Sequence, residues 1–192
     1  DIVTLKEAES ALKIEEIVFR NEREHARIEE SLEWIRTLDH PVKVLFVMPM
    51  YHEAVRLRPP GEENPDGEDA LRRKARQLHL LHQINPYFDW RLVGVDDEPE
   101  GSSIPVVNKL KEQIAEELGQ EVADRILTDR ISAEEAAAGS LKGGAVLRGL
   151  RAAVREGWAE YIGYTDVDIS TNLLQTGLLL APLHQGRAEA AI

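Results

Sequence analysis

The feature that most constrains the fold is a run of β-branched and apolar residues from Val42 to Met48, which ends at Pro49. Such a run, interrupted only by Lys43, is typical of a strand that is buried on both faces. The segment from Trp90 to Val95 has the same character, and shorter runs at 125–128 and 161–164 predict two further strands. The sequence therefore predicts a sheet with a buried centre.

Between these strands the apolar residues return at helical spacing. The pattern predicts helices over 70–84, 109–118, 133–138, 143–155 and 173–183, and a loop over 58–67, which is rich in Pro and Gly. Ser132 and Glu135 have the spacing of a capping box. Strands that alternate with helices indicate an α/β fold, with a mostly parallel, Rossmann-like sheet covered by helices on both faces.

A long amphipathic helix is predicted before this domain, from about residue 4 to 37. Its apolar positions, among them Ile28, Leu32 and Ile35, recur every three or four residues. We expect residues 1–40 to form this N-terminal helix and residues 41–192 to form the α/β domain. The helix has two interpretations, since it can dock on its own domain or form a coiled coil that makes a homodimer.

Composition excludes several classes of protein. The chain of 192 residues has 23 Lys and Arg, 35 Asp and Glu, a formal charge of −12, and no cysteine. A disulfide scaffold, a thiolate metal site and cysteine catalysis are thereby excluded, and general nucleic-acid binding is disfavoured because acidic surfaces repel phosphate backbones. No transmembrane span is expected, since the best candidate, 173–183, is interrupted by polar residues and Pro182. The chain does not open with Met, so we expect it to be trimmed or fragmentary.

Acidic or polar clusters follow three of the predicted strands. They are Tyr51-His52-Glu53, Asp96-Asp97-Glu98 and Asp166-Val167-Asp168. In parallel sheets ligands bind beyond the carboxyl ends of the strands, so these clusters are expected to share one edge. Carboxylates that converge repel one another unless a hard cation is shared among them. The Asp-x-Asp pair is therefore a candidate Mg²⁺ or Mn²⁺ site.

A second kind of signal lies at the start of the helix predicted at 143–155. Lys142 precedes Gly143 and Gly144, and free backbone amides at a helix N-terminus favour an anion. The segment lacks the spacing of a Walker loop or a dinucleotide fingerprint. His79 and His82 are three residues apart on a predicted helix, and we interpret them as surface or half-buried residues rather than metal ligands.

Taken in chain order, four of these segments resemble the nucleotide-sugar-binding half of a family-2 glycosyltransferase of the GT-A fold, a group that includes polyprenyl-phosphate sugar synthases. The segments are 44–53, 92–97, 142–145 with Gly149, and 164–170. The resemblance covers about residues 42 to 192. It implies a metal-dependent transferase of the hexosyltransferase type that uses a nucleotide diphosphate sugar.

The resemblance also implies roles for individual residues. The segment that wraps the nucleoside in the family is matched by Pro49, Met50 and Glu53, and the turn that reads the base is matched by Asp96 and Asp97. The segment beside the base and the ribose is matched by Lys142, Gly143 and Gly144. The pair that binds the donor and the metal is matched by Asp166 and Asp168. The metal, Mg²⁺ or Mn²⁺, would bridge the diphosphate and act as a Lewis acid. A cytoplasmic location is implied because nucleotide sugars are cytosolic.

The resemblance leaves other features open. The turn reads Asp97-Glu98-Pro99 instead of Asp-Gly-Ser, so base selectivity is not defined, and little chain follows the Asp-x-Asp helix, so the acceptor-binding half is expected to be incomplete. The catalytic residue, the acceptor and the sugar are unknown at this point. Two rival functions are a nucleotidyltransferase and a non-catalytic nucleotide-binding or dimerisation module built on the N-terminal helix.

Overall fold

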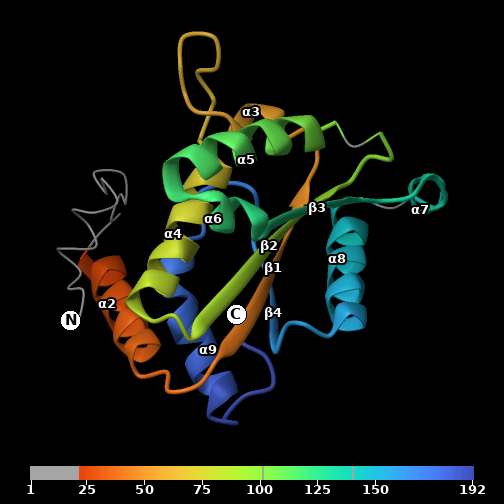
Figure 1. Ribbon diagram of the computed structural model, residues 1–192. Coiled ribbons are helices and arrows are strands. Elements are labelled where there is room, and N and C mark those ends of the chain that lie inside the picture. Colours follow the sequence, from red (N-terminus) through yellow and green to blue (C-terminus); the bar gives the residue numbers. More distant parts are fainter. Residues whose placement is uncertain (1–21, 101, 140) are drawn as a thin grey trace. The chain divides into compact units, whose positions relative to one another are not determined.

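The computed structural model describes residues 22–100, 102–139 and 141–192 (Figure 1). These residues fall into two compact units, one of which contains residues 22–42 together with 76–89 and 172–192. The other contains residues 43–75 and 90–171, and it holds most of the sheet. The boundaries fall inside β1 (Val42–Met50), β2 (Phe88–Asp96) and α4 (Ala70–Ile84) and in the segment before η2 (Leu173–Gln175).

Four parallel strands form the sheet: β1 (Val42–Met50), β2 (Phe88–Asp96), β3 (Ile126–Arg130) and β4 (Tyr161–Tyr164). Their order is β3-β2-β1-β4, which confirms the expected α/β class with a parallel sheet. β1 does not end at Pro49 but continues to Met50, whose carbonyl oxygen accepts a hydrogen bond of 2.7 Å from the backbone N–H of Asp97.

The strand order creates a switch point between β1 and β4. β2 lies on one side of β1 and β4 on the other, so the chain leaves β1 in one direction and later returns to its opposite edge. Ligands of open parallel sheets bind at such a point, beyond the carboxyl ends of the strands. The segments after Met50 and after Tyr164 are therefore brought together by topology.

Helix α8 (Lys142–Glu156) packs against β1 and begins one residue before the predicted position. Its Ala145 and Ala153 belong to a buried cluster with Leu45 and Val47 of the strand. The helix approaches closely because Gly149 has no side chain: a Cβ there would lie 2.4 Å from Val47 Cγ1. This contact fixes Lys142, the first residue of the helix, beside the ends of β1 and β4.

Four further helices belong to the same unit. They are α3 (Ala54–Leu57), α5 (Ile104–Leu118), α6 (Gln120–Asp124) and α7 (Ala133–Ala137). α3 and α6 were not anticipated, and α5 begins earlier than predicted, with Pro105 in its first turn, where a missing N–H is harmless. The predicted capping box of Ser132 and Glu135 is present at α7.

Helix α4 (Ala70–Ile84) has the predicted bounds, and its residues are divided between the two units. Its predicted apolar stripe, Leu71, Ala75, Leu78 and Leu81, is completely buried. His79 and His82 are half-buried, and His82 lies 2.8 Å from the carbonyl oxygen of Phe88.

The other unit is built on α2 (Glu22–Arg36), a 3-10 turn η2 (Leu173–Gln175) and α9 (Thr176–His184). Ile28, Leu32 and Ile35 are buried, and the backbone N–H of Gly177 donates to Ser31 Oγ at 2.8 Å. From Glu22 on, the long helix therefore docks within its own chain. The rest of its predicted length, 4–21, lies outside the described residues, and the homodimer stays a prediction.

None of the helices in the described ranges is long and apolar enough to cross a bilayer.

Candidate functional site

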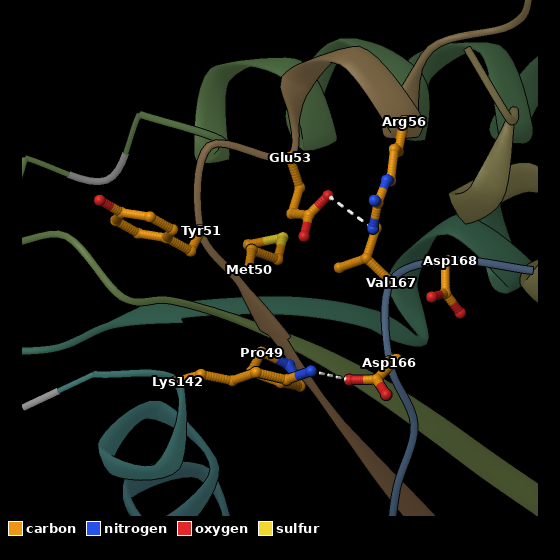
Figure 2. A pocket seen from close by; sticks show the side chains of 9 residues that line it. All are labelled: Pro49, Met50, Tyr51, Glu53, Arg56, Lys142, Asp166, Val167 and Asp168. Carbon is orange, nitrogen blue, oxygen red and sulfur yellow. Dashed lines mark ion pairs between the residues drawn. The ribbon is translucent and has the colours of Figure 1, made fainter. Parts of the chain in front are cut away.

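A small polar pocket lies at the switch point, where β1 and β4 end (Figure 2). Three separate segments line it, namely the end of β1 with α3, the start of α8, and the turn after β4. The lining residues are Pro49, Met50, Tyr51, Glu53, Arg56, Lys142, Asp166, Val167 and Asp168. Of the predicted site residues, Pro49, Met50, Glu53, Lys142, Asp166 and Asp168 are thus brought together in one place.

Asp166 is held by two donors in this pocket. The ammonium of Lys142 forms an ion pair with its Oδ1, and the Tyr164 hydroxyl donates to the same oxygen at 2.8 Å. Burial raises the pKa of Asp166, but the bonds from Lys142 and Tyr164 outweigh it, so the pKa lies below its ordinary value. The same ion pair raises the pKa of Lys142. Asp166 is therefore a carboxylate and Lys142 a cation at neutral pH.

Asp168 is stabilised by its own turn. Its Oδ1 accepts hydrogen bonds from the hydroxyl and, at 3.1 Å, the backbone N–H of Ser170, and these bonds lower its pKa. Among the described residues no donor is bonded to Oδ2. Asp168 therefore presents an ionised carboxylate with an oxygen left for a ligand.

Arg56 links the wall after β1 to the loop before α4. Its Nη1 lies 3.9 Å from Glu53 Oε2, and its Nε lies 3.6 Å from Glu68 Oε1. Glu68 in turn accepts a hydrogen bond of 3.1 Å from the backbone N–H of Ile169, just after the Asp-x-Asp pair. Burial raises the pKa of Glu53. The pocket is thus lined by both carboxylates and cations.

A buried cation lies behind this wall. Lys74 of α4 is only 1% exposed, and its ammonium donates to Thr165 Oγ1 at 3.2 Å. Burial lowers its pKa to about 8, while the charges of Asp168, Asp166 and Glu68 act in the opposite direction. Lys74 is thus coupled electrostatically to the same carboxylates.

The pocket is small but opens beside a larger hollow. Its volume of about 50 Å³ suits an ion with one or two waters, given the roughly 30 Å³ that a water occupies in the liquid. The neighbouring hollow, of about 670 Å³, shares Tyr51, Glu53 and Arg56 with it and is completed by the loop residues 65–68. That volume is in the range of small-molecule sites.

Asp96 and Asp97 do not line this pocket. Asp96 is fully buried and accepts hydrogen bonds from the backbone N–H groups of Ser103 at 2.7 Å and Glu98 at 3.2 Å, so it shapes the turn after β2. Asp97 is 8% exposed, and within the described part of the chain its buried Oδ1 has no hydrogen-bond partner. Burial raises the pKa of both carboxyls. Such an orphaned oxygen is costly unless a ligand bonds it.

Gly143 and Gly144 form the first turn of α8, beside Lys142, and are not among the residues that line the pocket. The N–H of Gly144 is used within the turn, bonded at 2.6 Å to the carbonyl oxygen of Leu141. A Cβ at Gly143 would have no heavy atom within 4 Å, so a molecule could approach the backbone there.

The donor set of the pocket fits a hard divalent cation that brings other ligands with it. Asp166 and Asp168 supply carboxylate oxygens, which Mg²⁺ and Mn²⁺ prefer. Across 22–100, 102–139 and 141–192, no three His, Asp or Glu side chains are placed to hold a metal by themselves. Mg²⁺ is commonly held by one or two carboxylates together with substrate phosphates, so a cation here would need further oxygens from a ligand.

Comparison of the chain with family models, curated proteins and solved structures gives no match. The function of the chain is therefore inferred from the site.

Two residues of this site were missed in the sequence. Arg56 belongs to a helix of only four residues, which is too short for a periodic signal. Lys74 did leave a signal, because it occupies a position in the apolar stripe of α4, between Leu71 and Leu78. A lysine in phase with buried residues indicates either a snorkelling side chain or a buried charge with a purpose.

Proposed function

We propose that this chain is the donor-binding part of a metal-dependent glycosyltransferase of the GT-A type, which transfers a sugar from a nucleotide diphosphate sugar. The observation that carries the proposal is the pocket at the switch point, where Asp166, Asp168 and Lys142 meet Glu53 and Arg56. Carboxylates for a cation and cations for phosphate are both needed to hold a metal–diphosphate group. The pocket supplies both.

In this proposal Asp168 and Asp166 hold Mg²⁺ or Mn²⁺ together with the diphosphate oxygens. The metal, when bound, stabilises the negative charge that develops on the departing nucleoside diphosphate. Lys142 pairs with Asp166 in this structure. A bound cation would compete for that carboxylate and so release the ammonium toward the phosphates.

In this proposal the nucleoside is placed by the end of β1 and by the turns that follow β1 and β2. Pro49, Met50 and Glu53 form one wall, and the Asp97 N–H is bonded to the Met50 carbonyl, which brings that turn next to the wall. The unpartnered Asp97 Oδ1 supports a role in bonding the base edge. Asp96, whose oxygens bond its own turn, is a positioning residue for Asp97. We assign no catalytic base and no acceptor.

The test is the product released from a donor in the presence of Mn²⁺, with water as the simplest acceptor. We expect UDP-glucose, GDP-mannose or ADP-glucose to yield the nucleoside diphosphate, at a rate that Asp168→Asn lowers on the order of a hundredfold because one oxygen ligand of the metal is lost. The control is Asp124→Asn, the same change at an exposed acid of α6. We expect it to leave the rate unchanged.

Other products would contradict the proposal. Release of pyrophosphate from a nucleoside triphosphate would indicate a nucleotidyltransferase, and equal rates in Asp168→Asn and the unaltered chain would remove the Asp-x-Asp pair from the reaction. No release with any donor would contradict the cleavage of a nucleotide diphosphate sugar by this chain.

A further inference from the structure

Lys74 is an unusual residue for the position that it occupies. It belongs to the face of α4 that carries Leu71, Ala75 and Leu78, and all four residues are buried. An ammonium at this depth loses most of its hydration, a cost that is normally offset by an ion pair. In the described part of the chain Lys74 has no ion pair, only its hydrogen bond to Thr165 Oγ1.

The direction in which the ammonium points gives the reason. Thr165 is the residue just before Asp166, and its backbone N–H bonds the carbonyl oxygen of Val47 at 3.0 Å, at the β1–β4 edge. Lys74 therefore reaches the base of the Asp-x-Asp turn. The carboxylates whose charges act on it are those of Asp168, Asp166 and Glu68.

We propose that Lys74 is a fixed countercharge that makes the Asp-x-Asp pair selective for a cation already bound to an anion. The inference rests on the proposed function, since it concerns how the same pocket chooses its ligand. A bare divalent cation approaching Asp166 and Asp168 is repelled by the buried ammonium. A cation that arrives with a diphosphate carries less net charge, and its phosphates are attracted by Lys74 and Lys142.

The physical basis is the low dielectric around Lys74. Charges near a surface interact with an effective dielectric constant of about 20, and water screens a buried charge less than an exposed one. The exposed Lys142 can turn away from Asp166 when a cation enters, whereas Lys74 is 1% exposed and its ammonium is held by the hydrogen bond to Thr165 Oγ1. The repulsion from Lys74 therefore persists as long as its ammonium is charged.

The experiment is a titration of the whole chain with Mn²⁺ alone at pH 7, in which free Mn²⁺ is followed by electron paramagnetic resonance. We expect Lys74→Met to bind Mn²⁺ about tenfold more tightly than the unaltered chain, because a nearby like charge is removed. Lys74→Arg keeps the charge and should match the unaltered chain. Lys109→Met, the same change at an exposed position of α5, controls for net charge.

Two further variants make the titration decisive. Adding Asp168→Asn to Lys74→Met should abolish the gained Mn²⁺ binding, which assigns it to this pocket, and Lys74→Gln is a second neutral variant in case Met does not fold. Unchanged or weaker Mn²⁺ binding in the neutral variants, including no binding in any of them, would overturn the proposal. The titration contains no nucleotide, so its outcome is separate from the test of sugar transfer.

Discussion

At the scale of single residues, the burial of the charged Lys74 lowers the stability of the folded chain. Burial lowers its pKa from 10.5 to about 8, which means that the folded chain holds the charged form less well than the unfolded chain does. The difference corresponds to roughly 3 kcal/mol of unfavourable free energy while the residue is charged. A buried apolar residue of similar length would avoid that cost, which agrees with the role proposed for the charge at the pocket.

This cost predicts a pH dependence with a definite sign. Between pH 8 and about 10.5 the unfolded chain keeps the proton on this lysine and the folded chain releases it, so stability contributed by this group rises with pH. We expect Lys74→Met to be more stable than the unaltered chain at pH 7. Its advantage should shrink by up to roughly 3 kcal/mol as the pH rises through that window.

Urea unfolding of both chains at several pH values between 7 and 10 measures this difference directly, and the subtraction removes the contributions of groups that both chains share. An advantage that stays constant across the window would show that Lys74 is not the buried charge described here.

At the scale of elements, the contact of α8 with β1 positions Lys142. Gly149 lies against Val47 and Val95, and a Cβ at residue 149 would lie 2.4 Å from Val47 Cγ1 and 3.1 Å from Val95 Cγ2. The strand is central and buried, so it cannot yield easily. A larger residue at position 149 would therefore displace the helix.

Gly149→Ala should lower the free energy of unfolding by about 1–3 kcal/mol, the usual cost of overpacking a core. Gly143→Ala is the matched control, because it lies in the same helix and a Cβ there has no heavy atom within 4 Å. We expect the control to be as stable as the unaltered chain, measured by urea unfolding. Equal stability of the two variants would contradict the described packing.

The secondary-structure elements also differ in how well they could be predicted from the sequence. The two long strands β1 and β2 and the helix at 70–84 were predictable because their apolar patterns are long and regular, whereas the strand order that creates the switch point is known only from the structure. Asp166, Asp168, Lys142 and Glu53 were found because they directly follow or precede such elements. α3 was missed because four residues carry no period.

The environments of individual side chains were harder to predict from the sequence. The sequence does not distinguish the adjacent Asp96 and Asp97. Asp96 accepts hydrogen bonds from its own turn, whereas Asp97 has an oxygen without a partner among the described residues. That difference depends on backbone N–H groups brought by Glu98 and Ser103, which no spacing rule specifies. The burial of Lys74 could be predicted only by knowing which face of α4 is buried.

At the scale of the whole molecule, the charge of −12 opposes the binding of an anionic nucleotide. The pocket itself contains both signs, with Glu53, Asp166 and Asp168 facing Arg56 and Lys142. A diphosphate therefore meets a site in which carboxylates already neutralise the cations. A divalent metal changes this balance, so binding of the diphosphate and the metal should be coupled, each strengthening the other by the same factor.

Calorimetric titration of UDP, GDP and ADP into the chain, each with and without Mn²⁺ and at one fixed ionic strength, measures this coupling. We expect one diphosphate to bind about tenfold more tightly, or more, with Mn²⁺ than without it, and Asp168→Asn to remove this difference. Equal affinity with and without the metal, or no binding of any diphosphate in either condition, would contradict a metal–diphosphate site at the switch point.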